Sequence, residues 1–203
     1  MPYAGMMLPH RVIVLLAAGA GSRYEGTGHK LSAEIVEPGT GRARTVIERA
    51  LAGALASEVG PVVVVTGAVP DIVPESLADA VTAHHNPRWA DGQITSVRAG
   101  IEAARALGAT AVVVGLADQP FIEPSAWRAV ADTPGPIVVA TYGGRRANPV
   151  KLDAEVWDLL PTTGDEGARA LMRVRPDLVR EVACGGSPAD IDTTEDLRRW
   201  QSN

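Results

Sequence analysis

The chain has 203 residues, of which 46% are hydrophobic and 21% charged, and this composition is typical of an ordinary globular protein. The formal net charge of −5 excludes the broad basic surface of a nucleic-acid-binding protein, so any phosphate site has to be local. The single cysteine, Cys184, excludes a disulfide framework and a cysteine-based zinc site, and it favours a reducing cytoplasm.

Residues 1–10 are predicted to form a flexible tail, and residues 11–203 a single domain. The predicted strands are Arg11–Ala17, Pro61–Thr66, Val81–His85, Ala111–Leu116, Ile137–Thr141 and Leu178–Ala183. The predicted helices are Thr45–Ser57, Asp71–Asp79, Ile94–Leu107, Pro124–Ala131, Asp153–Leu160, Glu166–Arg173 and Thr194–Gln201.

The alternation of strands and helices predicts an α/β fold with a mainly parallel sheet between two helical layers. The runs Val62–Val65 and Val112–Val114 are apolar at every position, as expected for strands that helices cover on both faces. Ligands bind to such sheets beyond the carboxyl ends of the strands. We therefore expect the functional residues just after each strand.

A glycine-rich segment with two cations, residues 16–31, follows the first predicted strand. Glycines let backbone N–H groups turn toward an anion, and cations help to hold a polyphosphate. A dinucleotide-binding fingerprint is excluded because Tyr24 stands where its third glycine is required. A P-loop is excluded because His29 separates Gly28 from Lys30.

Two acidic segments are candidate metal sites. Asp118 comes directly after the fourth predicted strand, where a carboxylate points into the crevice above the sheet. Mg²⁺ in proteins is held by one or two carboxylates together with substrate phosphates. Asp190 and Asp192 stand near the C-terminus, in a run that also suits a helix N-cap with Thr193 or Asp192 as the capping residue.

The run Leu-Ala-Ala-Gly-x-Gly-x-Arg, followed by Lys-Leu, resembles the signature of the molybdenum cofactor nucleotidyltransferases, and most closely that of their cytidylyltransferase branch. The runs Asp-Gln-Pro and Asp-Ile-Asp-Thr-x-Glu-Asp-Leu resemble two later motifs of this family, and the resemblance covers residues 11–199. It implies a three-layer, Rossmann-like and glycosyltransferase-A-like fold. It also implies transfer of CMP from CTP to the phosphate of molybdopterin or the molybdenum cofactor, with release of pyrophosphate.

The resemblance also assigns roles to single residues. Arg23, Lys30 and Asp118 are the implied catalytic residues, and Mg²⁺ is implied on Asp118 and Asp192, with Asp190 as a fallback. The implied nucleotide-binding residues are Leu16, Ala17, Ala18, Gly19, Gly21, Ser22, Arg23, Lys30, Gly92 and Ser96. Arg23 and Lys30 stand further apart than in the usual family pattern.

Four residues are implied to face the pterin: Arg146, Asn148, Asp165 and Arg169. A dianionic pterin phosphate would be bound by Arg146 or Arg169. Each of the two segments that carry these residues also suits a charged surface turn. Ala147 stands where the family usually has glycine.

The implied partners are CTP and the pterin phosphate cofactor, with a molybdenum hydroxylase or its chaperone as a candidate protein partner and with no nucleic acid or membrane. Two alternatives stay open. The acceptor could be a sugar phosphate or another phosphorylated cofactor precursor. The protein could also be a non-catalytic carrier that binds the pterin cofactor and delivers it to a molybdenum enzyme.

Overall fold

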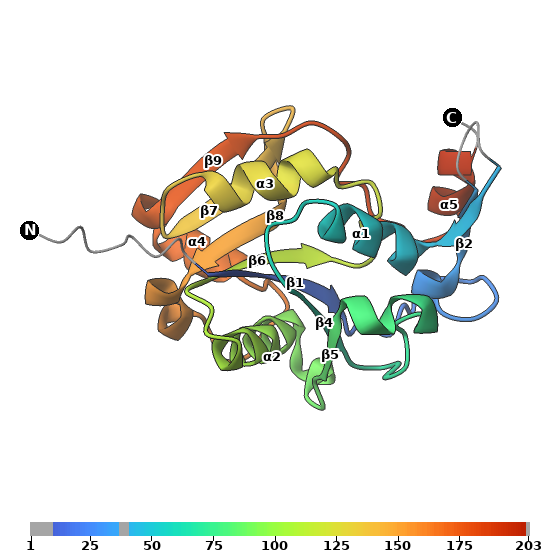
Figure 1. Ribbon diagram of the computed structural model, residues 1–203, viewed down its shortest axis with the longest axis horizontal. Coiled ribbons are helices and arrows are strands. Elements are labelled where there is room, and N and C mark those ends of the chain that lie inside the picture. The colour runs from blue at the N-terminus through green and yellow to red at the C-terminus, as the bar shows by residue number, and fades with distance from the viewer. Residues whose placement is uncertain (1–9, 37–40, 202–203) are drawn as a thin grey trace, which may run out of the picture.

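The computed structural model describes residues 10–36 and 41–201 and is built around a seven-stranded sheet with the order β5-β4-β1-β6-β8-β7-β9 (Figure 1). Its strands are β1 (Arg11–Ala17), β4 (Val62–Thr66), β5 (Thr82–His85), β6 (Ala111–Leu116), β7 (Ile137–Tyr142), β8 (Arg145–Asp153) and β9 (Val179–Ala183). Strand β8 is antiparallel to both β6 and β7, whereas the other neighbours in this sheet are parallel. A second, antiparallel sheet consists of β2 (Glu34–Val36) and β3 (Ala43–Thr45).

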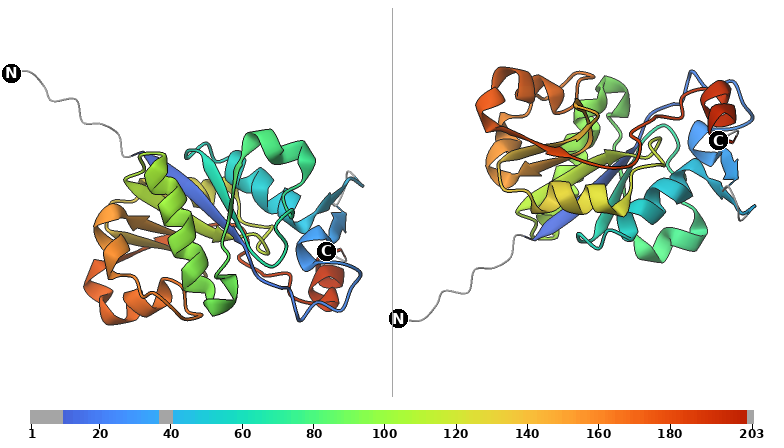
Figure 2. Two further views of the ribbon diagram at one scale, coloured as in Figure 1. Left: turned by 90° about the horizontal axis from the view of Figure 1, so that it is seen from below. Right: turned by 90° about the horizontal axis from the view of Figure 1, so that it is seen from above.

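Helices cover both faces of the main sheet. The α helices are α1 (Val46–Leu55), α2 (Gln93–Ala106), α3 (Pro124–Asp132), α4 (Arg169–Val174) and α5 (Thr194–Gln201). The 3₁₀ helices are η1 (Lys30–Ser32), η2 (Glu75–Ala80), η3 (Trp89–Asp91), η4 (Ala154–Leu159) and η5 (Pro176–Leu178). Along β1, Ile13 and Leu15 join the core under α1 and α3, while Val12 and Val14 join the core under α2. The expected three-layer α/β/α fold is thus confirmed (Figure 2).

Every predicted strand is present, and its ends agree with the prediction to within one residue. The apolar runs of β1, β4, β6 and β7 are buried on both faces of the sheet, which makes them easy to recognise, whereas the edge strands β5 and β9 are largely exposed. The helix predicted to begin at Glu166 begins later, at Arg169, because Gly167 takes a φ of 55°, which an α helix cannot continue through.

Two of the predicted helices are 3₁₀ helices rather than α helices. The predicted helix Asp71–Asp79 contains Pro74, which has no backbone N–H and precedes the shorter η2. The predicted helix Asp153–Leu160 is η4, which ends before Pro161 because proline disfavours the helical conformation at the residue in front of it.

Strand β8 was not predicted, because its residues Asn148 and Pro149 are of types depleted in strands. Gly143 and Gly144 have φ values of 56° and 79°, which form a two-residue hairpin turn between β7 and β8. The pairing with β7 skips Asn148 and Pro149, which creates a bulge in β8. Bulges re-aim a side chain, and this one places Asn148 at a cavity described below.

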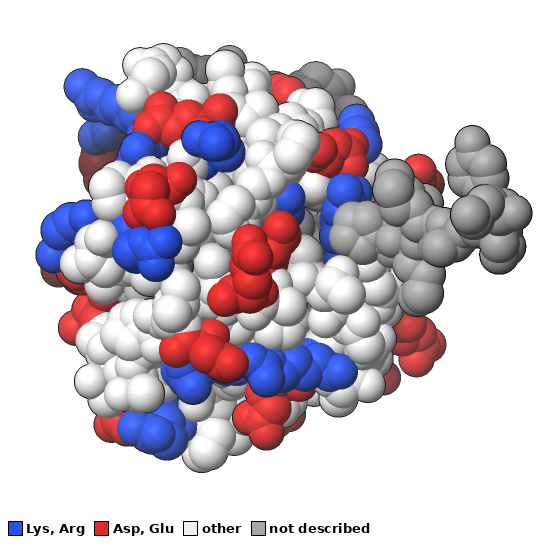
Figure 3. Space-filling model, turned by 90° about the vertical axis from the view of Figure 1, so that its left-hand side faces the viewer, with Lys and Arg blue, Asp and Glu red and all other residues white. Residues whose placement is uncertain are grey.

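The predicted flexible tail lies outside the described residues, except for His10. Among the helices of residues 10–36 and 41–201, none combines the length and apolar character that a membrane crossing requires. On the face shown in Figure 3, positive and negative side chains lie interspersed.

Candidate active site

Strands β1 and β6 end side by side, with Leu16 paired to Leu116. The chain proceeds from β1 to β4 and β5 on one side of the sheet and then crosses to β6 on the other side. A reversal of this kind leaves a crevice at the carboxyl ends of the strands, where α/β proteins bind ligands. Two cavities of about 380 Å³ and about 370 Å³ lie here, and Leu16, Gln93 and Leu116 line both of them.

The first cavity, here called the loop cavity, is lined by the glycine-rich segment after β1 and by later parts of the chain. All residues that were predicted to bind the nucleotide line it: Leu16, Ala17, Ala18, Gly19, Gly21, Ser22, Arg23, Lys30, Gly92 and Ser96. Asp118 and Asp192, the two predicted metal ligands, line it as well. Folding thus brings the predicted nucleotide and metal residues to one place.

His29 closes the glycine-rich loop. Its Nε2 donates to the Gly19 carbonyl at 3.0 Å, and its Nδ1 accepts from the backbone N–H of Leu31 at 3.3 Å. Gly21 has a φ of 64°, and a Cβ there would lie 3.1 Å from Nε2 of His29. Because His29 folds the loop back on itself, Lys30 reaches the cavity despite the long spacing from Arg23.

Lys30 connects the two carboxylates. Its Nζ lies 2.5 Å from Oδ2 of Asp118 and 2.8 Å from Oδ1 of Asp192, and its side chain is 11% exposed. Burial lowers the pKa of Lys30, but the charges and hydrogen bonds of Asp118 and Asp192 outweigh it and raise the pKa above 10.5. Arg23 reaches Oδ2 of Asp192 at 3.0 Å with a side chain that is 76% exposed. In this structure Lys30 is therefore a buried cation between the two carboxylates, whereas Arg23 is an exposed, peripheral one.

Asp192 is positioned by the start of α5 and by the end of β6. The Thr193 hydroxyl accepts from the backbone N–H of Asp196 at 3.1 Å, while Asp196 accepts from the backbone N–H of Thr193 at 2.9 Å. Thr193 is therefore the capping residue. The backbone N–H of Ile191 donates to the Asp118 carbonyl at 2.8 Å, which fixes the two acidic segments against each other. Asp190 is not among the lining residues of the loop cavity, and burial raises the pKa of its carboxyl group.

The pair Asp118 and Asp192 fits a divalent cation. Oδ1 of Asp118 is buried and has no hydrogen-bond partner in the described part of the chain, although an unsatisfied buried acceptor costs about 1–3 kcal/mol. Hard cations prefer such carboxylate oxygens. Within residues 10–36 and 41–201, no group of three or more His, Cys, Asp or Glu side chains could hold a metal ion. A cation at this place would therefore need phosphate oxygens or water as its remaining ligands.

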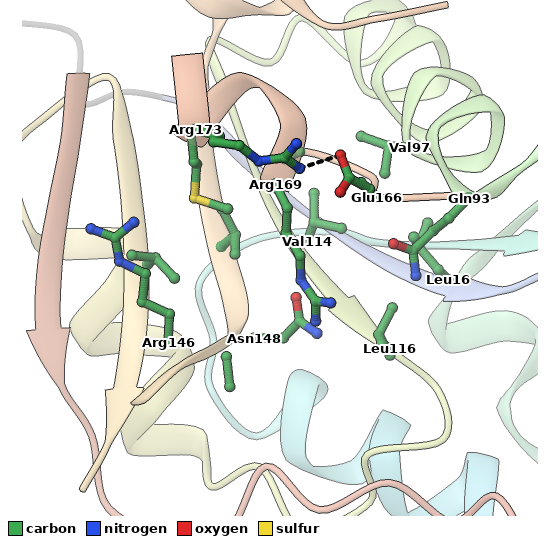
Figure 4. Close-up of a pocket in the computed structure, with 15 residues that line it drawn as sticks. Leu16, Gln93, Val97, Val114, Leu116, Arg146, Asn148, Glu166, Arg169 and Arg173 are labelled. Atoms are coloured by element: carbon green, nitrogen blue, oxygen red, sulfur yellow. Dashed lines mark hydrogen bonds and ion pairs between the residues drawn. The ribbon is translucent and has the colours of Figure 1, made fainter. Parts of the chain in front are cut away.

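The second cavity, here called the arginine cavity, has Val97, Val114, Val139 and Met172 among its apolar lining residues and arginines at its rim. Arg169 has no ion-pair partner among the described residues and points toward Asn148 (Figure 4). Two other arginines of this cavity are already paired. Arg146 turns away from the centre and lies 2.7 Å from Glu181, and Arg173 is paired with Glu166.

Asp165 lines the loop cavity and not the arginine cavity, so the structure separates it from the other three predicted pterin residues. Gly92 has a φ of 108°, and a Cβ there would lie 2.5 Å from the Gly164 carbonyl oxygen. This glycine is thus required by the neighbouring loop, which carries Asp165. Gln93 lines both cavities and was missed, since only its place directly after Gly92 could have suggested it.

A doubly covered α/β sheet with a glycine-rich loop, two cations and two carboxylates at its crevice has the features expected of a nucleotidyltransferase domain. The chain belongs to the family of MobA-like NTP transferase domains, and the match spans residues 13–181. The chain is 33% identical to the purine catabolism protein PucB of Bacillus subtilis over 110 residues, which are 52% of this chain and 54% of PucB. The matched part thus spans about half the length of that relative.

Solved structures with this fold cover the chain almost completely. A nucleotidyl transferase from Methanothermobacter thermautotroptrophicus has a TM-score of 0.77 at 23% identity and covers 95% of this chain and 96% of its own. Rv0371c from Mycobacterium tuberculosis has a TM-score of 0.72 at 24% identity, with 98% of this chain and 100% of its own covered. At these identities the likeness shows the fold alone.

Proposed function

We propose that the protein is a magnesium-dependent nucleotidyltransferase that transfers CMP from CTP to the phosphate of molybdopterin or the molybdenum cofactor. The observation that carries this proposal is that the loop cavity, with Lys30 between two carboxylates, adjoins a second cavity with an unpaired arginine. The shared lining residues also support the proposal that residues 11–203 act as one domain.

The loop cavity is assigned to CTP. Backbone amides of Gly19, Gly21 and Ser22 would face the triphosphate, and Arg23 and Lys30 would neutralise it. A phosphate oxygen of the acceptor attacks the α-phosphorus, the bond to the β-phosphate oxygen breaks, and pyrophosphate leaves. Such chemistry needs positioning and charge neutralisation rather than a covalent nucleophile. An acceptor phosphate that is already ionised at neutral pH needs no general base.

Asp118 and Asp192 are the residues that would hold Mg²⁺, whose charge would stabilise the reacting phosphates. Rv0371c of M. tuberculosis, a structure with the same fold, has been solved in complex with manganese. This supports a divalent cation in the present protein. Lys30 would have to leave its place between the carboxylates when the cation binds, and the triphosphate offers it new partners.

The arginine cavity is assigned to the acceptor. Its apolar lining by Val97, Val114, Val139 and Met172 suits a flat ring better than a sugar with many hydroxyl groups. Arg169 is the cation available for the acceptor phosphate, since Arg146 is already paired. Asp165 was expected at the acceptor, but because it lines the loop cavity we assign it to the nucleotide site.

The direct test is pyrophosphate release from CTP with Mg²⁺ and purified molybdenum cofactor. Release that depends on the cofactor supports the enzyme. Binding of the cofactor without release would instead make the protein a carrier. A screen of phosphorylated acceptors, sugar phosphates included, then tests the acceptor assignment.

We expect Arg169→Ala to raise the KM for the acceptor and to leave the KM for CTP unchanged. A charge-assisted phosphate contact contributes roughly 1.5–3 kcal/mol, which corresponds to roughly 10- to 100-fold in KM. Arg146→Ala is the matched control, because Arg146 is paired with Glu181, and its effect should be several-fold smaller. Equal effects of the two variants would show that the orientation of Arg169 has no bearing on acceptor binding.

We expect a preference for CTP over GTP and ATP because of Ala18. The guanylyl branch of the resembled family typically has glycine at this position. Ala18 lines the loop cavity, and its Cβ would lie 2.8 Å from a Cβ added to Gly67, so the wall is tightly packed here. A methyl group narrows the base pocket and favours a single-ring base. Discrimination by shape alone is worth roughly 10- to 200-fold.

The measurement is kcat/KM for the four nucleoside triphosphates with one acceptor. Ala18→Gly should reduce the difference between CTP and GTP without inverting it. Wild-type protein that uses GTP as well as CTP would refute the assignment.

A further inference from the structure

The side chain of Gln119 has defined partners on both of its polar atoms, although it lines neither the loop cavity nor the arginine cavity. It is 6% exposed and directly follows Asp118. Its Nε2 donates to the carbonyl of Pro188 at 3.0 Å and to Oδ1 of Asp190 at 2.5 Å. Its Oε1 accepts from Nδ2 of Asn148 at 3.1 Å. Both amide protons and the amide oxygen are therefore used, which fixes the orientation of the group.

These partners belong to different parts of the site. Pro188 and Asp190 are in the segment that leads to Asp192, the second carboxylate of the loop cavity. Asn148 is in the bulge of β8 and lines the arginine cavity. One buried amide thus joins the second carboxylate to the neighbouring cavity. Sequence motifs cannot show this, because Gln119 and its partners come from three segments that are distant in the sequence.

The C-terminal segment that begins at Pro188 is also held at its other end, in α5, by an aromatic contact. Trp200 in α5 stacks on Phe121 with ring centroids 3.7 Å apart, and the Arg49 guanidinium lies 5.2 Å from the Phe121 ring centre. The segment is therefore held at Asp190 by Gln119 and at Trp200 by Phe121, and Asp192 lies between these two attachments. Gln119 is the attachment nearer to the carboxylate.

We propose that Gln119 is a positioning residue that holds Asp192 opposite Asp118 and links this arrangement to the arginine cavity through Asn148. The proposal rests on the proposed function, in which both carboxylates serve a divalent cation together with CTP. Gln119 itself lines neither cavity, so its effect is exerted through Asp190, Asn148 and the adjoining backbone. Removing its donors should displace Asp192 and weaken the binding of the cation and nucleotide together.

A double-mutant cycle tests the contact itself. Gln119→Glu replaces the donor nitrogen by an oxygen, so the hydrogen bonds to Oδ1 of Asp190 and to the Pro188 carbonyl are both lost. Asp190→Asn alone should have little effect, because an asparagine oxygen can still accept from Gln119. In the double variant Gln119→Glu/Asp190→Asn, the asparagine amide donates to the glutamate and restores the hydrogen bond between residues 119 and 190, but not the one to the Pro188 carbonyl.

The readout is the affinity for Mn²⁺ in the presence of CTP and without an acceptor, measured from the electron paramagnetic resonance signal of free Mn²⁺. We expect Gln119→Glu to weaken this affinity about tenfold and the double variant to recover most of the loss, as coupling between contacting residues predicts. Val130→Ala in α3 is the control for general destabilisation, since Val130 is fully buried in the core away from the site. The melting temperature of each variant is measured in parallel.

Normal Mn²⁺ and CTP binding by Gln119→Glu would overturn the proposal. A double variant that binds Mn²⁺ no better than Gln119→Glu would also overturn it. The same holds if Gln119→Glu loses no more affinity than Val130→Ala does when both variants lose the same amount of melting temperature. Failure of the wild-type protein to bind Mn²⁺ with CTP would instead count against the proposed function, so the two failures are distinguishable.

Discussion

Asp118→Asn is expected to reduce pyrophosphate release by on the order of 100-fold or more, the scale on which one stabilising group acts in a transition state. Asp118 contributes a buried oxygen without a hydrogen-bond partner and a second oxygen that binds Lys30. Asparagine keeps the shape and can still accept from Lys30, so the protein should stay folded. The loss therefore reports on the charge of the carboxylate.

The measurement is pyrophosphate release from CTP over a range of Mg²⁺ concentrations. Asp132→Asn is the matched control, because Asp132 pairs with Arg11 through a side chain that is 68% exposed. Asp192→Asn should mainly raise the Mg²⁺ concentration that is required. Near-wild-type turnover of Asp118→Asn with an unchanged Mg²⁺ requirement would show that the metal assignment is wrong.

Lys30→Ala is expected to change two affinities in opposite directions. Binding of CTP should weaken, since losing a charge-assisted phosphate contact costs roughly 1.5–3 kcal/mol. Binding of Mn²⁺ without nucleotide should become tighter, because Asp118 and Asp192 lose the ammonium group that neutralises them. A residue with a purely structural role would not produce this pair of effects.

Both affinities can be measured by titration calorimetry. Arg23→Ala is the control, because the exposed Arg23 pairs with one of the two carboxylates, Asp192, and should change Mn²⁺ binding less. An unchanged kcat/KM for CTP in Lys30→Ala would mean that Lys30 does not act on the nucleotide. Weaker Mn²⁺ binding without nucleotide would contradict its position as a competing cation.

The strands of the sheet were predictable where burial on both faces determines their residue types. Strands β1, β4 and β6 are buried on both faces, and such strands must be apolar at nearly every position. Strand β8 begins with two arginines and contains a bulge with Asn148 and Pro149, so its pairing with β6 and β7 decides its structure. Local propensity is too weak to reveal such a strand.

The candidate site was predictable as a set of residues but not as an arrangement. The position after a strand was enough to select Asp118, and a family-like motif was enough to select Asp192. Nothing in the sequence pattern shows that Lys30 lies between them, because this depends on the two hydrogen bonds of His29. Similarly, Arg146 and Arg169 look equivalent in the sequence, and only the partner Glu181 on β9 distinguishes them.

The closure of the glycine-rich loop by His29 has a consequence for how its length can vary. Residues 25–28 line neither the loop cavity nor the arginine cavity, and Glu25, Thr27 and Gly28 are exposed. Because His29 hydrogen-bonds both Gly19 and Leu31, which directly follows Lys30, the stretch between Arg23 and His29 behaves as a spacer between two fixed points of the loop. Exposed stretches of this kind tolerate insertions and deletions. Related proteins can therefore differ in the number of residues here and still present the same lysine to the same carboxylates.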